Sequence, residues 1–301
     1  MDSATTLSTF NRPAALRQAR AILRHHGKSY YYSTCLFPRE LQNATCAVYA
    51  FVRLPDEIVD NSPTETPEDL RRVKTRLLEF QEEWRRAYQS GQSSEPVLQL
   101  AAQTWHDYKI PYEYSEEFLA AMIQDTVQTD YADYADLEGY MYGSAAVIGL
   151  MMSHLVGFER PETLEHAKKL GYAMQLTNFL RDIDEDFQLR GRVYMPADEL
   201  ARFGLSRDDI AARQFSPDFR AFVEFQAARC HRLYEEANQG IPFLKPEGRF
   251  AVATASTLYR AILGKLEAQD WNPFAGRAKT SFPEKLVLTG KAWQLSRGAV
   301  K

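Results

Sequence analysis

The chain has 301 residues, 45% of them hydrophobic and 25% charged, which is typical of a folded globular protein and excludes a disordered chain. The net charge is −4 and the isoelectric point about 5.9, so no overall positive field attracts nucleic acid, and we expect no nucleic-acid partner. Three cysteines without metal-ligand spacing indicate free thiols. Because Met1–Thr6 also lack the features of a secretory signal, we expect a cytoplasmic protein.

Helical periodicity covers nearly the whole sequence, and no hairpin signal is present. Ser62-Pro63 is predicted to end a helix, and the stretch from Gln188 to Pro196 is predicted to be a loop because of Gly191 and Pro196. We predict helices at 13–26, 38–60, 67–90, 95–109, 115–130, 135–157, 161–188, 206–213, 217–239, 247–269 and 280–295. No repeat or composition shift divides the chain, so we predict an all-α fold with a single domain over 1–301, comprising a core of about 14–277 and a basic tail, 278–301.

The segment from Gly139 to Phe158 carries no acidic or cationic side chain and is long enough to cross a membrane. It also contains four glycines, two serines, two tyrosines and His154, which favour a buried central helix over a membrane span. Tyr140 is followed by the small residues Gly143, Ser144, Ala145, Ala146 and Gly149. Taken alone, they fit close helix–helix packing better than the wall of an apolar tunnel.

Two short acidic clusters, DEIVD (56–60) and DIDED (182–186), share one geometry. In each cluster, two aspartates are four residues apart on a predicted helix, so their side chains lie on the same face, one turn apart. Each pair continues a polar stripe along an otherwise apolar helix. The first stripe comprises Tyr49, Arg53, Asp56 and Asp60, and the second comprises Gln175, Asn178, Asp182, Glu185 and Asp186.

A single acidic pair is most simply interpreted as part of a solvated helix face, but two such stripes on apolar helices favour a metal site. Burying an unpaired carboxylate costs several kcal/mol, so a stripe of this kind requires a cation. Carboxylate oxygens suit Mg²⁺, which binds one or two carboxylates together with substrate phosphates. The sequence argues against zinc, because no set of histidine and cysteine residues has ligand spacing.

Cationic side chains that could bind a phosphate lie near both clusters. Lys28 and Ser29 follow a helix break, Arg53 and Arg181 lie within a turn of the acids, and Arg190 and Arg192 flank Gly191. Arginine and lysine beside Mg²⁺ can stabilise the charge that develops on a departing phosphate. A P-loop is absent.

These residues resemble a known family, the head-to-head trans-isoprenyl diphosphate synthases, which comprise the squalene and phytoene synthases. The resemblance covers roughly Lys28 to Arg277. The first acidic motif, DEIVD, is more similar to the DELVD of phytoene synthases than to the DTVED of eukaryotic squalene synthases. The segments that carry the resemblance are HGKSYYYS (26–33), VYAFVRLPDEIVD (48–60), YMYGSAAVIG (140–149), QLTNFLRDIDEDF (175–187) and RVYMP (192–196).

The resemblance implies a single isoprenoid-synthase-type helical domain with a central cavity. It also implies a Mg²⁺-dependent 1-1′ condensation of two prenyl diphosphates through a cyclopropyl diphosphate. Mn²⁺ is an alternative metal. The leading hypothesis is a phytoene synthase-like enzyme that uses geranylgeranyl diphosphate in carotenoid biosynthesis, with further carotenoid enzymes as partners downstream. The runner-up is a squalene or dehydrosqualene synthase that uses farnesyl diphosphate, and only the squalene-forming reaction requires NADPH.

The resemblance also assigns roles to individual residues. Asp56, Asp60, Asp182 and Asp186 would hold the metal, with help from Glu185. Diphosphates would contact Ser29, Arg53, Asn178, Tyr259 and Arg277, the last two on a looser match. Tyr49, Tyr140 and Tyr194 would lie near the reacting carbons, where an aromatic face or phenol can steer a cation or proton. The cavity would be lined by Ser144, Ala145, Ile148, Gly149 and Gln175.

The chain departs from the family at two points. Val52 replaces the cysteine that commonly precedes the arginine of the first motif, and Pro55 is unexpected inside a helix because it removes a hydrogen bond and kinks the chain. A third hypothesis is a non-catalytic relative that serves as an assembly factor. Such relatives lose acidic ligands, whereas both clusters are intact here.

The segment from Arg277 to Lys301 contains six Lys and Arg residues and one acid, Glu284, interspersed with apolar side chains. A basic amphipathic segment of this kind could rest on an anionic membrane, and a solvated terminal helix explains the pattern about equally well.

Overall fold

The computed structural model of the chain describes residues 10–62 and 66–297. Met1–Thr6, Pro63 and the last four residues of the predicted tail therefore lie outside the described residues. The helices are α1 (Arg12–His26), α2 (Lys28–Thr34), α3 (Arg39–Asp60), α4 (Pro67–Ser90), α5 (Pro96–Asp107), α6 (Tyr112–Gln124), α7 (Tyr134–Met141), the π-helical η1 (Tyr142–Ala146), α8 (Val147–Val156), α9 (Thr163–Arg190), α10 (Ala197–Arg202), α11 (Arg207–Ala211), α12 (Pro217–Asn238), the short 3₁₀ turn η2 (Ile241–Phe243), α13 (Pro246–Ala268), the 3₁₀ turn η3 (Pro273–Ala275) and α14 (Phe282–Ser296).

The predicted all-α fold is confirmed, since the described residues contain isolated β-bridges but no strand. The sequence did not reveal α2 and α10, which are too short to show helical periodicity. The helix predicted at 115–130 ends at Gln124 instead. There the hydroxyl of Thr126 donates to the carbonyl oxygen of Ile123, an alternative to helical pairing.

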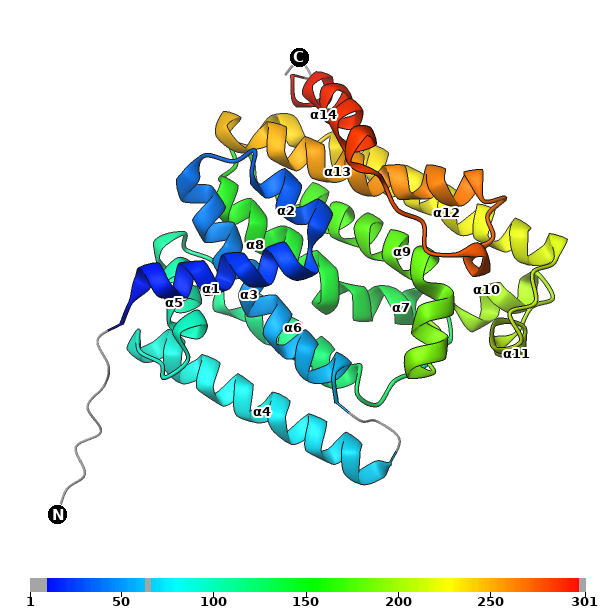
Figure 1. Cartoon of the computed structure of the whole chain (residues 1–301), viewed down its shortest axis with the longest axis horizontal. Coiled ribbons are helices and arrows are strands. Elements are labelled where there is room, and N and C mark those ends of the chain that lie inside the picture. Colours follow the sequence, from blue (N-terminus) through cyan, green and yellow to red (C-terminus); the bar gives the residue numbers. More distant parts are fainter. Residues whose placement is uncertain (1–9, 63–65, 298–301) are drawn as a thin grey trace.

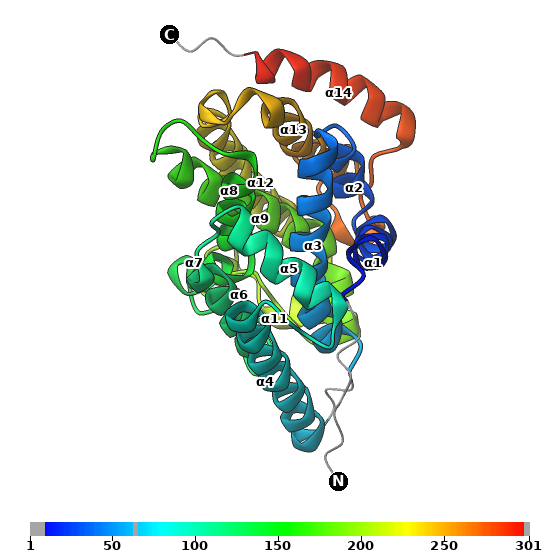
Figure 2. The same cartoon turned by 90° about the vertical axis from the view of Figure 1, so that its left-hand side faces the viewer.

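The 28-residue helix α9 runs through the middle of the fold and contacts α8, α12 and α13 (Figure 1). Helix α3 contacts α1, α5 and α8, and α4 lies along the lower edge in the same view. Figure 2 shows α14 covering α13 at the top of the molecule, with α2 and α1 below its N-terminal end. The two helices that carry the acidic clusters, α3 and α9, therefore belong to one helical assembly.

A buried aromatic cluster fixes α3 against its neighbours. The ring centroid of Phe51 lies 4.4 Å from that of Trp84 on α4 and 4.9 Å from that of Trp105 on α5. The indole N–H of Trp84 donates to the hydroxyl of Ser115 over 2.8 Å. Burial of large aromatic rings contributes strongly to core stability, so this cluster holds one side of α3 while the polar stripe occupies another.

The uncharged segment from Gly139 to Phe158 forms the end of α7, the π-helical turn η1 and all of α8. Most of its residues are buried, as expected for a central helix. Within the described residues, no helix combines the length and the hydropathy that a membrane crossing requires. A π-helical turn is rare and often marks a functional site, and this one carries Ser144 and Ala145.

Glycines allow α8 and α9 to approach each other backbone to backbone. A Cβ atom at Gly149 would overlap the carbonyl oxygen of Ala167, and one at Gly171 would overlap the carbonyl oxygen of Ala145. The small residues therefore serve close packing, as their pattern alone predicts. Gly149 also lies in the wall of the cavity described below.

We expect Gly149→Ala to lower the free energy of unfolding by roughly 1–3 kcal/mol, because the added methyl forces the two backbones apart. Gly139→Ala is the matched control, since a Cβ there meets no atom within 4 Å and alanine is favoured in a helix. Urea denaturation of both variants measures the difference. Equal stability of the two variants would contradict the packing argument.

Candidate active site

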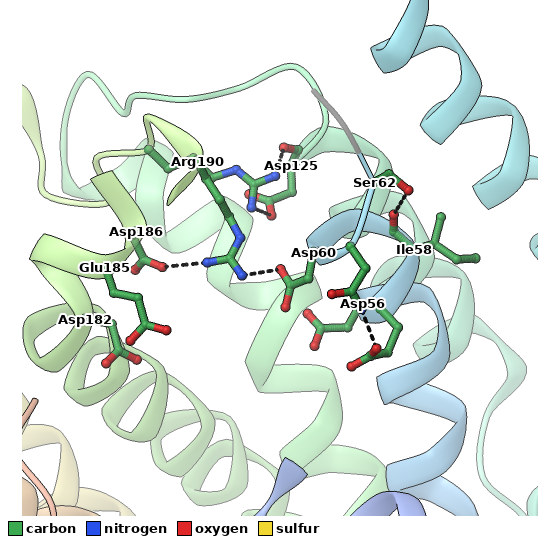
Figure 3. A network of polar contacts seen from close by, with 12 residues as sticks. Asp56, Ile58, Asp60, Ser62, Asp125, Asp182, Glu185, Asp186 and Arg190 are labelled. Carbon is green, nitrogen blue, oxygen red and sulfur yellow. Dashed lines mark hydrogen bonds and ion pairs between the residues drawn. The ribbon is translucent and has the colours of Figure 1, made fainter. Parts of the chain in front are cut away.

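The two acidic clusters face each other across a gap between α3 and α9 (Figure 3). Arg190, at the end of α9, bridges them. Its Nη2 lies 3.0 Å from Oδ1 of Asp60, and its Nη1 lies 3.5 Å from Oδ1 of Asp186. One guanidinium thus reaches both clusters, which the fold brings from distant parts of the sequence into one site.

Arg53 neutralises the cluster on α3. It pairs with Asp56, donates from Nε to Oε1 of Glu57 over 2.6 Å, and lies 3.6 Å from Oδ2 of Asp60. Helix α3 continues through Pro55 as far as Asp60. Although Pro55 removes one backbone donor, it leaves Asp56 and Asp60 on one face, because Arg53 reaches both.

Asp182 lies between two guanidiniums. It accepts from Nε of Arg181 over 2.8 Å and pairs with Nε of Arg277 at 2.9 Å. Arg277 also lies 3.3 Å from Oε2 of Glu185. Tyr259 of α13 is close enough for the charges of Arg181 and Asp182 to act on its phenol. Tyr259 and Arg277, the two residues assigned on a looser match to the family, therefore lie at the second acidic cluster.

A buried carboxylate that the sequence did not single out, Asp125, lies close enough to both clusters for its charge to act on Asp56 and Asp186. Arg192 Nη1 pairs with its Oδ2 at 2.8 Å, and the hydroxyl of Tyr194 donates to its Oδ1 over 3.0 Å. Burial raises the pKa of Asp125, and the positive charge of Arg192 opposes that shift. The sequence signal was weak: one acid at the end of an apolar helical segment.

Two of the predicted catalytic tyrosines belong to a buried aromatic stack beside Asp125. The ring of Tyr194 lies 4.1 Å from that of Phe179 and 5.7 Å from that of Tyr140, and both pairs are nearly parallel. Burial and the charge of Asp125 raise the pKa values of Tyr140 and Tyr194 well above their ordinary value. Both phenols therefore remain protonated at neutral pH and can donate hydrogen bonds.

An apolar cavity lies along the N-terminal part of α9 and reaches Gln175, two helical turns before Asp182, with about 970 Å³ of empty space including its mouth. The residues predicted to line a cavity all contribute to its wall: Ser144, Ala145, Ile148, Gly149 and Gln175. The side-chain oxygen of Asn178, one turn from Gln175 and from Asp182, is buried without a hydrogen-bond partner. An unpaired buried acceptor of this kind suits a cation or a donor that arrives with a ligand.

The third predicted tyrosine, Tyr49, lies apart from the Tyr140 stack. Its ring packs on Gly27 and lies 5.6 Å from that of Tyr30, which lines the cavity. Ser29 lies in the first turn of α2, close to Gly27 in sequence, and no described contact joins it to the acids. Nearby, Nδ1 of His26 lies 3.3 Å from Oε1 of Glu57, a contact that ties the C-terminal end of α1 to α3.

Burial raises the pKa of Asp186 to about 7, and the charge of Asp182 adds to the increase while Arg190 opposes it. Burial and the charge of Asp60 likewise raise the pKa of Asp56. A bound cation would stabilise the charged form of these carboxyl groups and so lower their pKa values.

These side chains suit Mg²⁺ that is coordinated partly by water and phosphate, rather than a metal enclosed by protein ligands alone. Among the described residues, no three histidine, cysteine or acidic side chains converge tightly enough to hold a metal by themselves. The predicted ligands, Asp56, Asp60, Asp182, Glu185 and Asp186, instead form two hard-oxygen groups with Arg190 between them. Mg²⁺ typically uses one or two carboxylates and completes its coordination with water and phosphate oxygens.

We expect the metal-free protein to lose stability relative to Asp186→Asn as the pH rises from about 5 to 8. The folded-state pKa of Asp186 is raised to about 7 from an ordinary value of 3.8. The stability that the protonated Asp186 side chain contributes is therefore complete below its pKa in the unfolded chain and is lost as the pH rises through its pKa in the folded protein. The amide of the Asp186→Asn variant stays neutral throughout. Thermal unfolding of both proteins in EDTA measures the difference. A wild type that gains stability relative to the variant over this range would contradict the shift.

The comparisons with known proteins agree with the geometry. The squalene/phytoene synthase family matches residues 23–284. The chain is similar to the 15-cis-phytoene synthase of Synechocystis sp., with 31% identity over 91% of this chain and 83% of that protein. It is also similar to the phytoene synthase of Thermus thermophilus, with 34% identity over 92% of this chain and 91% of the relative.

Solved structures show the same fold. A dehydrosqualene synthase crystallised with a ligand superposes with a TM-score of 0.84 and 28% identity, covering 96% of this chain and 98% of that one. A squalene synthase from Alicyclobacillus acidocaldarius superposes with a TM-score of 0.78 and 26% identity, covering 87% and 97%. The predicted resemblance and enzyme class are confirmed. The chain belongs to the squalene/phytoene synthase family, whose members are prenyltransferases.

Proposed function

We propose that this protein condenses two molecules of geranylgeranyl diphosphate head to head to give 15-cis-phytoene, with Mg²⁺ as its metal and Mn²⁺ as a substitute. The observation that carries the proposal is the juxtaposition of two facing acidic clusters with an apolar cavity. Similarity to phytoene synthases of bacteria and plants supports this choice of product. The product would pass to further enzymes of carotenoid biosynthesis.

The chain's own residues would bind the two diphosphates and keep the reacting carbons dry. Asp56 and Asp60 on one side, and Asp182, Glu185 and Asp186 on the other, would hold Mg²⁺. When bound, the metal neutralises the diphosphate and makes it a better leaving group. Arg53, Arg181, Arg190 and Arg277 now pair with these acids and would turn to the diphosphate oxygens, aided by Ser29, Asn178 and Tyr259.

The cavity would take the prenyl chains and exclude water from the cations. Loss of the first diphosphate leaves an allylic cation, which the double bond of the second substrate captures. Loss of a proton then gives the cyclopropyl diphosphate. Loss of the second diphosphate, rearrangement and loss of another proton give the conjugated triene. Tyr49, Tyr140 and Tyr194 would present aromatic faces or phenols to these cations.

The second candidate is condensation of farnesyl diphosphate to dehydrosqualene, or to squalene with NADPH. It is favoured by the structural similarity to a dehydrosqualene synthase and to a squalene synthase. A non-catalytic assembly role has less support, because both acidic clusters are complete and face each other.

Product identification tests the proposal. The protein is incubated with Mg²⁺ and either geranylgeranyl or farnesyl diphosphate, with and without NADPH, and the hydrocarbon is identified by mass and ultraviolet absorption. A C40 conjugated triene from geranylgeranyl diphosphate supports the proposal. A C30 triene made only from farnesyl diphosphate, or a product without the triene that appears only with NADPH, identifies the alternative.

A further inference from the structure

The surface formed by α1, α2 and the C-terminal helix α14 has two features that the proposed reaction does not use. One is a basic groove on α1, and the other is an exposed apolar stripe on α14. In Figure 2, α1, α2 and the beginning of α14 lie along one side of the molecule. We refer to this surface, defined by Arg17, Arg20 and Arg24 together with Phe282, Leu286 and Trp293, as the α1–α14 face.

The groove on α1 carries concentrated positive charge. Arg17, Arg20 and Arg24 follow steps of three and four, so they lie on one side of the helix, and together with His25 and Tyr31 they line a surface hollow. No acidic residue occurs between Asp2 and Glu40 in the sequence. Within residues 10–62 and 66–297, none of the three arginines forms an ion pair, and Arg20 donates instead to Asn43 over 2.9 Å. The groove therefore offers positive charge to an external anion.

The stripe on α14 concentrates exposed apolar area. Of the seven large hydrophobic side chains exposed among the described residues, four lie on α14: Phe282 (65% exposed), Leu286 (54%), Val287 (64%) and Trp293 (48%). Glu284, the acid of this helix, pairs with Lys265 of α13, whereas Lys291 and Arg297 are exposed. An apolar stripe bordered by cations, with tryptophan at its edge, has the chemistry of an interfacial helix.

Helix α2 links the two features and also forms part of the cavity wall. The Thr289 hydroxyl on α14 donates to that of Tyr32 over 3.1 Å, and Phe282 meets the Tyr32 ring edge-on. Ser33 and Thr34 of the same helix line the cavity. A surface that docks on α14 and α1 would therefore lie next to α2, a helix that forms part of the cavity wall.

We propose that the α1–α14 face docks the protein on an anionic lipid bilayer. Positive charge without counter-ions complements acidic headgroups, and the α14 stripe is suited to the acyl boundary beneath them. A second copy of the protein could bind here only if its acidic and apolar side chains matched the positions of these arginines and apolar residues. An anionic bilayer presents negative headgroups and an apolar interior over its whole surface, so it needs no such match. The inference rests on the proposed function only for the reason that docking would be useful, namely delivery of an apolar product to the bilayer. Binding itself follows from the surface.

Vesicle flotation of the full chain tests the proposal, with phosphatidylcholine vesicles that contain or lack phosphatidylglycerol. We expect binding that requires the anionic lipid and weakens at high salt. Arg17→Gln/Arg24→Gln should lower apparent affinity by roughly tenfold or more. The matched control, Arg85→Gln/Arg86→Gln, removes two exposed arginines from α4 and should bind normally.

The apolar stripe has its own pair of variants. Leu286→Gln/Trp293→Gln should reduce vesicle binding by roughly tenfold or more, whereas Leu78→Gln, at an exposed leucine of α4, should not. Turnover of detergent-dispersed substrate should be equal in all variants, which separates loss of docking from loss of fold or function. Equal vesicle binding by variants and wild type, or a dimer that only the α14 variant disrupts, would overturn the proposal.

Discussion

Asp182→Asn is expected to lower kcat by roughly a thousandfold or more, because one anionic ligand at the centre of the second cluster is lost. Asp182 is held by Arg181 and Arg277, and both guanidiniums remain in the variant. Diphosphate binding should therefore persist in part, so that the loss appears in kcat more than in KM. Steady-state turnover at saturating Mg²⁺ measures the effect.

The neighbouring acid of the same motif provides the control. Asp184 lies two residues further along α9, on the opposite side of the helix from Asp182, and pairs with Arg213 at 3.0 Å. Asp184→Asn removes the same charge from the same turn and should retain most of the activity. Unchanged activity of Asp182→Asn, or an equal loss in both variants, would contradict the assignment of the second cluster.

Ala251→Phe is expected to shift substrate preference toward the shorter prenyl chain by roughly tenfold or more. Along α9 the cavity wall runs from Gln175, near the acids, to Thr163, about 18 Å away at the rise of an α-helix. Ala251 lies at the far end, in a cluster with Phe37, Val156 and Leu244. A phenyl ring there would shorten the cavity and leave the diphosphate end unchanged.

The control for this variant is Ala268→Phe, which adds the same ring at an exposed position on the same helix. The ratio of kcat/KM for geranylgeranyl and farnesyl diphosphate is compared among the wild type and both variants. Thermal unfolding checks that the buried ring has not disrupted the fold. If Ala251→Phe leaves this ratio of kcat/KM values unchanged in a folded protein, the cavity does not determine which prenyl chain length is preferred.

The fold was predictable because local periodicity determines long helices. The stripe at Asp56 and Asp60 was correctly assigned to one helix face, and α3 continues through Pro55 because its other backbone bonds and its aromatic contacts hold it. The π-helical turn was not predictable, because close packing at Gly143 and Gly149, rather than residue preference, shapes that segment.

The candidate site was predictable only where residues are grouped in sequence. The acidic pairs can be recognised in the sequence by their four-residue spacing, whereas Asp125 and Arg192 come into contact only in the folded chain. Nothing in the spacing alone indicated that Arg190 bridges the clusters, since this contact depends on how α3 and α9 face each other. The resemblance supplied Tyr259 and Arg277, which the fold places beside Asp182.

The central claim is that the two acidic clusters act as one site, joined by metal and diphosphate. Anomalous diffraction from crystals grown with Mn²⁺ and a thiodiphosphate substrate analogue, which does not ionise readily, tests it most directly. The account predicts Mn²⁺ at the Asp56/Asp60 pair and at the Asp182/Asp186 pair, with the diphosphate between them and Arg190 moved from its bridge. Metal at neither pair, or a diphosphate bound elsewhere with the Arg190 bridge intact, would contradict it.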